Sequence, residues 1–217
     1  YILIINLSPL NAKENYTQIL SEINLKNFKA AIKEGNKKKW ANSLKYLNNI
    51  DNTVAKKIII WRWLIAHDGI SSKDDLRQFY INNQNWPKIN AIKKKIEFKN
   101  SINNFKDNML WFQENPPISG IAKVKLSEQL IKNKFIEEGK WLLKDAWISH
   151  TFSYSEEKYI LKNLKNIISK EDHTKRIEKL IWNKSWGSAN RQLKRVSNNI
   201  KLLSIAKIKL SRRRGNV

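Results

Sequence analysis

Cysteine is absent from this chain of 217 residues. Without a thiol the protein can form no disulfide, no thiolate metal site and no cysteine nucleophile, and its redox compartment is left open. Glycine and proline are scarce, with 6 and 4 residues, and no proline follows Pro117. So few chain breakers argue against an all-β fold, because such a fold requires many turns.

Long apolar runs are missing as well. The chain has no stretch of about eighteen apolar residues, so we expect no transmembrane segment. Acidic residues number 19 against 42 basic ones, which leaves a net charge of +23. Hydrophobic residues nevertheless make up 41% of the chain and aromatic residues 10%. This composition indicates a folded protein rather than a disordered one.

The excess of positive charge comes mainly from lysine. The chain holds 34 Lys, 30 Ile and 27 Asn, and all three have AT-rich codons. A base-composition bias in the gene therefore explains much of the lysine excess, although any basic surface attracts polyanions. The segment from Lys179 to Val217 has eleven basic residues and no acidic one, but no aromatic residue follows Trp186. Nucleic-acid sites interleave aromatic and basic residues, so we expect no specific nucleic-acid partner.

The first twelve residues read as the end of a secretory signal. An apolar run, Tyr1–Leu7, is followed by Pro9 and then by Ala12. This order predicts that residues 1–12 are a remnant of a signal peptide cleaved after Ala12. Signal-peptide cleavage sites prefer a small residue at position −3, and Leu10 does not fit this preference. The alternative is the frayed start of a helix or strand.

Apolar residues recur at spacings of three and four, as in Ile160, Leu164 and Ile167. This periodicity predicts an all-α fold. We expect twelve helices, over residues 16–34, 38–49, 53–67, 72–83, 87–98, 104–114, 119–135, 136–148, 155–168, 171–183, 185–197 and 199–213. Short connections favour antiparallel neighbours. Residues 13–217 should thus form part of a superhelical α-solenoid of stacked short helical hairpins, TPR-like but irregular.

Helix starts are also visible in the sequence. Ser71-x-x-Asp74, Ser153-x-x-Glu156 and Ser169-x-x-Asp172 each place a hydroxyl three residues before an acid. This spacing is typical of a capping box at a helix N-terminus.

A weak internal sequence repeat occurs at the predicted turns. The segment Ala31…Gly35…Trp40-Ala41 resembles both Phe135…Gly139-Lys140-Trp141 and Trp182…Trp186…Ala189. In each segment a tryptophan or a small residue follows a turn. We interpret the nine tryptophans mainly as core residues that fill wedges between hairpins, with ligand platforms as the alternative.

No catalytic site is evident. His67, His150 and His173 are far apart in sequence, and no zinc, phosphate-loop or nucleophile-elbow motif occurs. We therefore predict no catalytic, cofactor-binding or metal-binding residue. Glu137-Glu138 and Glu156-Glu157 are pairs of neighbouring acids on predicted helices. The two side chains of each pair point about 100° apart, so they form no acid–base pair and should be solvated. Asp172-His173-x-x-Arg176 is interpreted as an ion-pair cluster, because it lacks a nucleophile.

A series of unusual pieces spans residues 40–210. In order they are Trp40-Ala41, Ile50-Asp51, Val54-Ala55-Lys56-Lys57-Ile58, Trp61-x-Trp63-Leu64, Phe79, Asn85-Trp86-Pro87, Trp111-Phe112-x-x-Asn115-Pro116-Pro117-Ile118-Ser119-Gly120, Ala122-Lys123-x-x-Leu126-x-x-x-Leu130, Ala146-Trp147 and Asp172-His173-x-x-Arg176-x-x-x-Leu180-x-Trp182, leading to Ala189. Taken together, they resemble the N-terminal superhelical region of the soluble lytic transglycosylases of Gram-negative bacteria.

The resemblance implies a periplasmic protein that acts on peptidoglycan. In that family a separate C-terminal lysozyme-like domain cleaves glycan strands between N-acetylmuramic acid and N-acetylglucosamine, leaving 1,6-anhydromuramyl ends. The catalytic Glu of the family lies in a Glu-Ser pair, and this chain has none. We therefore expect a fragment that lacks the catalytic domain and is inactive alone. Its implied partners are glycan strands and its own catalytic domain. The alternative is a helical-repeat, protein-binding scaffold without enzymatic activity.

Overall fold

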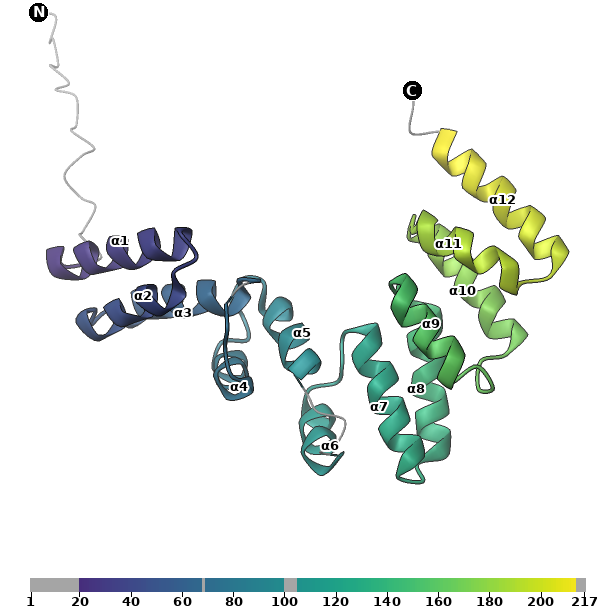
Figure 1. Cartoon of the computed structure of the whole chain (residues 1–217), viewed down its shortest axis with the longest axis horizontal. Coiled ribbons are helices and arrows are strands. Elements are labelled where there is room, and N and C mark those ends of the chain that lie inside the picture. Colours follow the sequence, from purple (N-terminus) through teal and green to yellow (C-terminus); the bar gives the residue numbers. More distant parts are fainter. Residues whose placement is uncertain (1–19, 68, 100–104, 214–217) are drawn as a thin grey trace, which may run out of the picture. The chain divides into compact units, whose positions relative to one another are not determined.

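The computed structural model describes residues 20–67, 69–99 and 105–213 of the chain (Figure 1). Within these ranges all regular structure is helical, with twelve α-helices, two short 3-10 turns and no strand. The predicted all-α class is confirmed. The predicted signal remnant, residues 1–12, lies outside the described residues, and the continuous superhelix stays a prediction.

The chain divides into two compact units, residues 1–82 and 83–217. The helices of unit 1 are α1 (Glu22–Asn36), α2 (Trp40–Lys45), α3 (Thr53–Ile65) and α4 (Lys73–Asn82). Those of unit 2 are α5 (Ile89–Lys99), α6 (Phe105–Glu114), α7 (Gly120–Lys132), α8 (Ile136–Ser149), α9 (Tyr154–Asn163), α10 (Lys170–Trp182), α11 (Trp186–Gln192) and α12 (Asn198–Arg213). The 3-10 turns, Tyr46–Asn49 and Leu193–Arg195, extend α2 and α11.

In unit 1 the helices α1, α2 and α3 pack against one another. Their shared core consists of Ala31, Ile50, Ala55 and Ile59, each at most 3% exposed. Two of the four are alanines, which allow the helix axes to approach closely. A ring of half-buried apolar residues surrounds this centre, namely Leu20, Phe28, Ile32, Leu44, Tyr46 and Leu47.

Among the described residues of unit 2, the helices from α7 onward contain two apolar cores, and α5 and α6 also bury Ile92, Ile96, Trp111 and Phe112. The larger one joins α7, α8 and α9 with the segment that precedes α10, through Val124, Leu143, Ala146, Trp147, Phe152, Ile160 and Ile168. The smaller one joins α10, α11 and α12 through Leu180, Ala189 and Ile208. Because α10 also packs against α8, the two cores form one continuous stack of helices.

Three helical hairpins share one turn geometry. In the turns that join α1 to α2, α7 to α8 and α10 to α11, the residue after the helix C-cap has a positive φ, and each time it is a lysine: Lys38 (62°), Lys134 (71°) and Lys184 (54°). In each turn the next backbone N–H donates to a carbonyl five residues earlier, as Phe135 does to Leu130 at 2.9 Å. This is the Schellman motif, which places two antiparallel helices side by side.

The second helix of each hairpin carries a small residue five positions after this lysine. Ser43 donates from Oγ to the carbonyl of Ala31 at 2.8 Å. A Cβ on Gly139 would lie 2.8 Å from the carbonyl oxygen of Ser127, so only glycine fits there. Ala189 is fully buried in the third hairpin. The structure thus equates Ser43, Gly139 and Ala189. The pairing of Gly35 with Gly139 suggested by the sequence is wrong, because Gly35 precedes its turn and Gly139 follows its own.

Two of the three predicted capping boxes are confirmed. Ser153 with Glu156 and Ser169 with Asp172 close reciprocal hydrogen bonds at the starts of α9 and α10. The predicted pair Ser71 and Asp74 is wrong by one residue. Ser72 Oγ accepts the N–H of Asp75 at 3.0 Å, and the Asp75 carboxylate accepts the N–H of Ser72 at 3.0 Å. Ser71 is instead buried.

In the part of the chain that the structure describes, every helix is too short or too polar to cross a membrane.

The shared turn geometry makes a prediction about stability. A side chain in the left-handed region costs about 1–2 kcal/mol, and glycine avoids this penalty but loses more entropy on folding. We expect Lys134→Gly to raise the free energy of unfolding by about 1 kcal/mol. Urea denaturation measures the change. Lys158→Gly, in the middle of α9, is the control and should lower stability by about 1 kcal/mol. A destabilised Lys134→Gly variant would contradict the assigned turn.

Candidate functional site

The three histidines lie in different surroundings. His67 is exposed after α3, whereas His150 and His173 are half-buried in unit 2. Among the described residues no group of three metal-ligating side chains is close enough to hold an ion. The acid pair Glu137 and Glu138 is exposed on α8, as predicted. The prediction for the other pair is wrong for Glu157, which is only 1% exposed.

Glu157 is buried because two arginines from later helices converge on it. Its Oε1 accepts from Arg176 at 3.2 Å, and its Oε2 accepts from Arg191 Nε at 2.8 Å. The three side chains come from α9, α10 and α11. Nothing at positions 156–157 marks the second acid as internal, because the partners lie 19 and 34 residues away.

Arg176 is the centre of this polar cluster. Its side chain is fully buried, and NH1 donates to the backbone carbonyls of Trp147 and, at 2.8 Å, of His150. Its Cζ lies 4.1 Å from the centre of the Trp147 ring. Burial lowers the pKa of Arg176 to about 10 against the opposing effect of Glu157, so the guanidinium stays protonated at neutral pH. Because its partners are groups of the protein itself, the cluster holds helices together.

Asp172, His173 and Arg176, interpreted from the sequence as an ion-pair cluster, have different partners in the structure. Asp172 caps α10 through Ser169, while Nδ1 of His173 lies 3.0 Å from the side-chain amide of Gln192. Each of the three residues has its own structural partner. The interpretation of this segment as ion-pair residues therefore holds for Arg176, which pairs with Glu157. It also holds for Asp172, whose carboxylate lies 3.9 Å from Lys144 Nζ in addition to capping α10.

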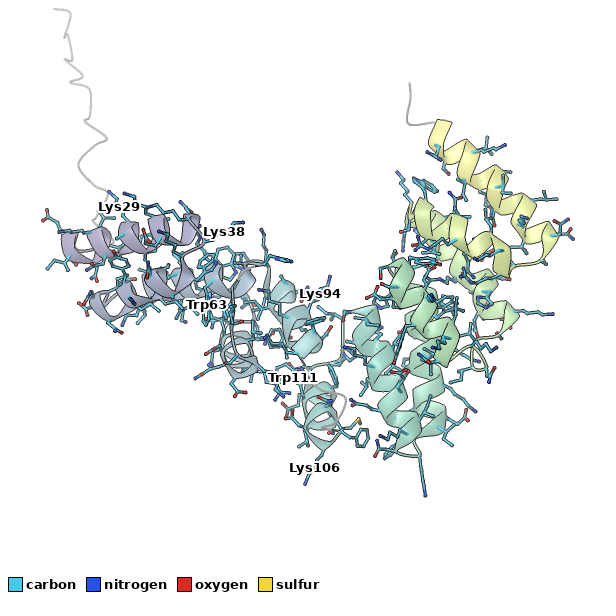
Figure 2. The ribbon with its side chains drawn as sticks, viewed as in Figure 1. Lys29, Lys38, Trp63, Lys94, Lys106 and Trp111 are labelled. Carbon is cyan, nitrogen blue, oxygen red and sulfur yellow. The ribbon has the colours of Figure 1, made fainter. Side chains whose placement is uncertain are left out.

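The strongest candidate for ligand binding lies at one end of unit 1. Two hollows of about 500 and 560 Å³ share Lys38 and Trp40. The first is also lined by Lys39, Trp63 and Ile70, and the second by Trp61, Arg62 and His67. Figure 2 shows Lys38 and Trp63 at the same end of this unit. In the described part of the chain, the charged groups that line both hollows are basic.

Local structure explains why Trp40 lines both hollows. It is the first residue of α2, directly after the turn that holds Lys38 at positive φ. A Cβ on Gly35 would lie 3.0 Å from the Trp40 ring, so the glycine lets the indole lie against the end of α1. Arg62 donates to the side-chain oxygen of Asn36 at 2.7 Å and ties α3 to the same end.

This arrangement suits one class of ligand. An indole presents a broad apolar face, and ammonium groups attract carboxylates. In a hollow lined by aromatic rings, a few polar groups fix the orientation of the ligand. A sugar ring has an apolar C–H face that packs on indole. The hollows around Trp40 can therefore accept a sugar with an acidic substituent.

The structure also places the other tryptophans. Trp111 and Trp147 are buried, five others are half-buried, and Trp141 and Trp182 are 69% and 82% exposed. The prediction that the nine are mainly core residues therefore holds fully for two, in part for five, and is wrong for Trp141 and Trp182. Several lie at the ends of short hairpins, where too few neighbouring helices are present to cover an indole. The sequence signal for this was their position next to turns.

Comparison with known proteins finds no matching family model, no matching curated protein and no matching solved structure.

Removal of Arg176 tests the role of the polar cluster. Arg176→Ala leaves carbonyl groups without their donor and an unbalanced buried charge, so the free energy of unfolding should fall by about 3–5 kcal/mol. Thermal or urea denaturation measures it. The neighbouring Lys175 forms an exposed ion pair with Glu171, and Lys175→Ala should leave stability unchanged. Equal effects of the two substitutions would contradict the central position of Arg176.

The half-buried histidines of unit 2 predict a dependence of stability on pH. Burial lowers the pKa of His173 below its ordinary value of 6.5, and Arg195 adds to this effect. Burial and Lys123 also lower the pKa of His150. Unfolding therefore takes up protons, so stability is complete above pH 6.5 and falls as the pH drops through that value.

Urea midpoints between pH 7.5 and 5 measure this dependence. His173→Gln should flatten the curve of stability against pH. The control, His67→Gln, changes an exposed residue and should leave the curve unchanged. A His173→Gln curve parallel to that of the wild-type protein would contradict the assignment.

Proposed function

We propose that this chain is the N-terminal superhelical region of a periplasmic lytic transglycosylase, and that it holds peptidoglycan glycan strands. The pair of basic, indole-lined hollows around Trp40 carries this proposal. Cleavage between N-acetylmuramic acid and N-acetylglucosamine belongs to a separate lysozyme-like domain. No residue of this chain is given a catalytic role, and no cofactor is involved.

The helical hairpins and the order of motifs from Trp40 to Ala189 support the proposal, since both match what the family's helical region requires. A curved wall of such hairpins would limit which strands reach the catalytic domain. Peptidoglycan carries carboxylates on its peptide stems and on muramic acid. A protein with a net charge of +23 attracts such a polymer, and salt weakens the attraction because it screens charges beyond about 8 Å at physiological ionic strength.

Cosedimentation with purified, insoluble sacculi over a series of NaCl concentrations tests the proposal. The wild-type chain should bind at low salt and lose binding as salt rises. The double variant Lys38→Gly/Lys39→Gln removes two charges at the hollows. The matched control, Lys29→Gln/Lys33→Gln, removes two exposed charges from α1. We expect the first variant to bind at least several-fold more weakly than the control at equal salt.

Four results would contradict the proposal. Absence of binding would exclude glycan strands as ligands of this chain. Binding that ignores salt would exclude the electrostatic attraction. Equal loss in the two double variants would mean that overall charge, and not the hollows, causes retention. Release of soluble muropeptides by this chain alone, detected by mass spectrometry, would overturn the assignment of cleavage to a separate domain.

A further inference from the structure

The combination of lysine and tryptophan at Trp40 recurs in unit 2. Lys184 has a φ of 54° in the turn between α10 and α11, and Trp186 is the first residue of α11. Lys38 and Trp40 hold the same two places in the turn between α1 and α2. Both turns close with the same pair of backbone hydrogen bonds; for example, Ser185 donates to Leu180 at 2.9 Å. We call this element, a left-handed lysine followed two residues later by tryptophan, the Lys-x-Trp turn.

A hollow lies beside the second Lys-x-Trp turn as well. It measures about 920 Å³ and is lined by residues of α10 and α12 and by Trp186, which is half-buried against the core of these helices. Trp182 is 82% exposed and Leu210 is 64% exposed, so this wall presents apolar surface to solvent. Lys184 and Lys207 line the hollow with one acid, Glu178. Two indoles and two ammonium groups thus surround a space large enough for a sugar.

The third hairpin supplies an internal comparison. Its turn has Lys134 in the same left-handed conformation, but Ile136 stands where the other two hairpins have tryptophan. The backbone of the turn therefore forms without an indole. It also does not require lysine, because glycine adopts a positive φ more easily. Tryptophan and lysine at the other two turns are separable from folding.

We propose that the Lys-x-Trp turn is a binding element for sugars that carry a carboxylate, and that the hollow at Lys184 and Trp186 is a second such site, in unit 2. The indole faces of Trp182 and Trp186 pack on the apolar face of the ring. Lys184 and Lys207 pair with the carboxylate, and Glu178 accepts hydrogen bonds from hydroxyl groups. The identity of the sugar rests on the proposed function, in which it is the N-acetylmuramic acid unit of the glycan strand.

The test uses the 217-residue chain labelled with ¹⁵N at its tryptophan indoles. N-acetylmuramic acid is titrated and followed by NMR, with N-acetylglucosamine, which lacks the carboxylate, as the matched probe. Indole signals assigned through Trp182→Phe and Trp186→Phe should shift with N-acetylmuramic acid. Affinity for N-acetylglucosamine should be at least five-fold lower.

Two lysine variants isolate the role of the charge. Lys184→Gly keeps the turn and removes the ammonium group, so we expect at least a five-fold loss of affinity for N-acetylmuramic acid and none for N-acetylglucosamine. Lys134→Gly makes the same change in the hairpin without the indole and should alter neither affinity. Trp182→Ala, at the most exposed indole, should weaken binding of both sugars.

Several outcomes would overturn the inference: unmoved signals of Trp182 and Trp186, equal affinity for the two sugars, or equal effects of Lys184→Gly and Lys134→Gly. Loss of self-association in Trp182→Ala without loss of sugar binding would assign the surface to contact between copies. If sacculi bind normally while Lys184→Gly changes nothing, the second site fails and the proposed function stands. If the sugar binds at this site but sacculi do not sediment the protein, the second site stands and the proposed function fails.

Discussion

The architecture depends on the Schellman turn between the two helices of a hairpin. Its two backbone hydrogen bonds force one residue into the left-handed region and reverse the chain within three residues. The second helix then lies so close to the first that the facing position holds only a small residue. Gly139, which faces the backbone of Ser127, is the example. The hollows at Trp40 and Trp186 adjoin two of these turns.

A second level of order comes from the polar cluster of unit 2. Arg176 reaches from α10 to backbone carbonyls at the end of α8 and to Glu157 on α9, while Arg191 on α11 reaches the same carboxylate. A buried guanidinium is expensive to desolvate, and here that cost is offset by the carboxylate of Glu157 and by the backbone carbonyls that accept from NH1. These contacts align four successive helices. It also explains why an acid predicted to be solvated is internal.

Thin stacks of short helices leave their edges uncovered, and this connects the fold to its proposed function. An indole at a hairpin end has helices on one side and solvent on the other. At Trp40 and at Trp186 this half-covered ring lies next to a lysine held by the turn, and a hollow adjoins each. The same backbone device thus builds the helical array and presents a cation beside an aromatic face. The proposed ligand, a polymer with repeated acidic sugars, would offer each of these hollows the same kind of group.

Apolar spacing in the sequence by itself determined that the protein is all-α, because helical periodicity is a local property. It also located the twelve helices, although the first was expected to begin six residues before Glu22 and the ninth to end five residues after Asn163. Local too were the capping boxes at Ser153 and Ser169. The alignment of the three hairpins with one another could not be read from local sequence, because a lysine carries no signal that it will adopt a positive φ. The packed hairpin imposes that conformation on Lys38, Lys134 and Lys184. Likewise, burial of Glu157 and exposure of Trp182 depend on partners distant in the chain. Tertiary structure alone decided them, because burial is set by which helices meet and not by the residues beside each position.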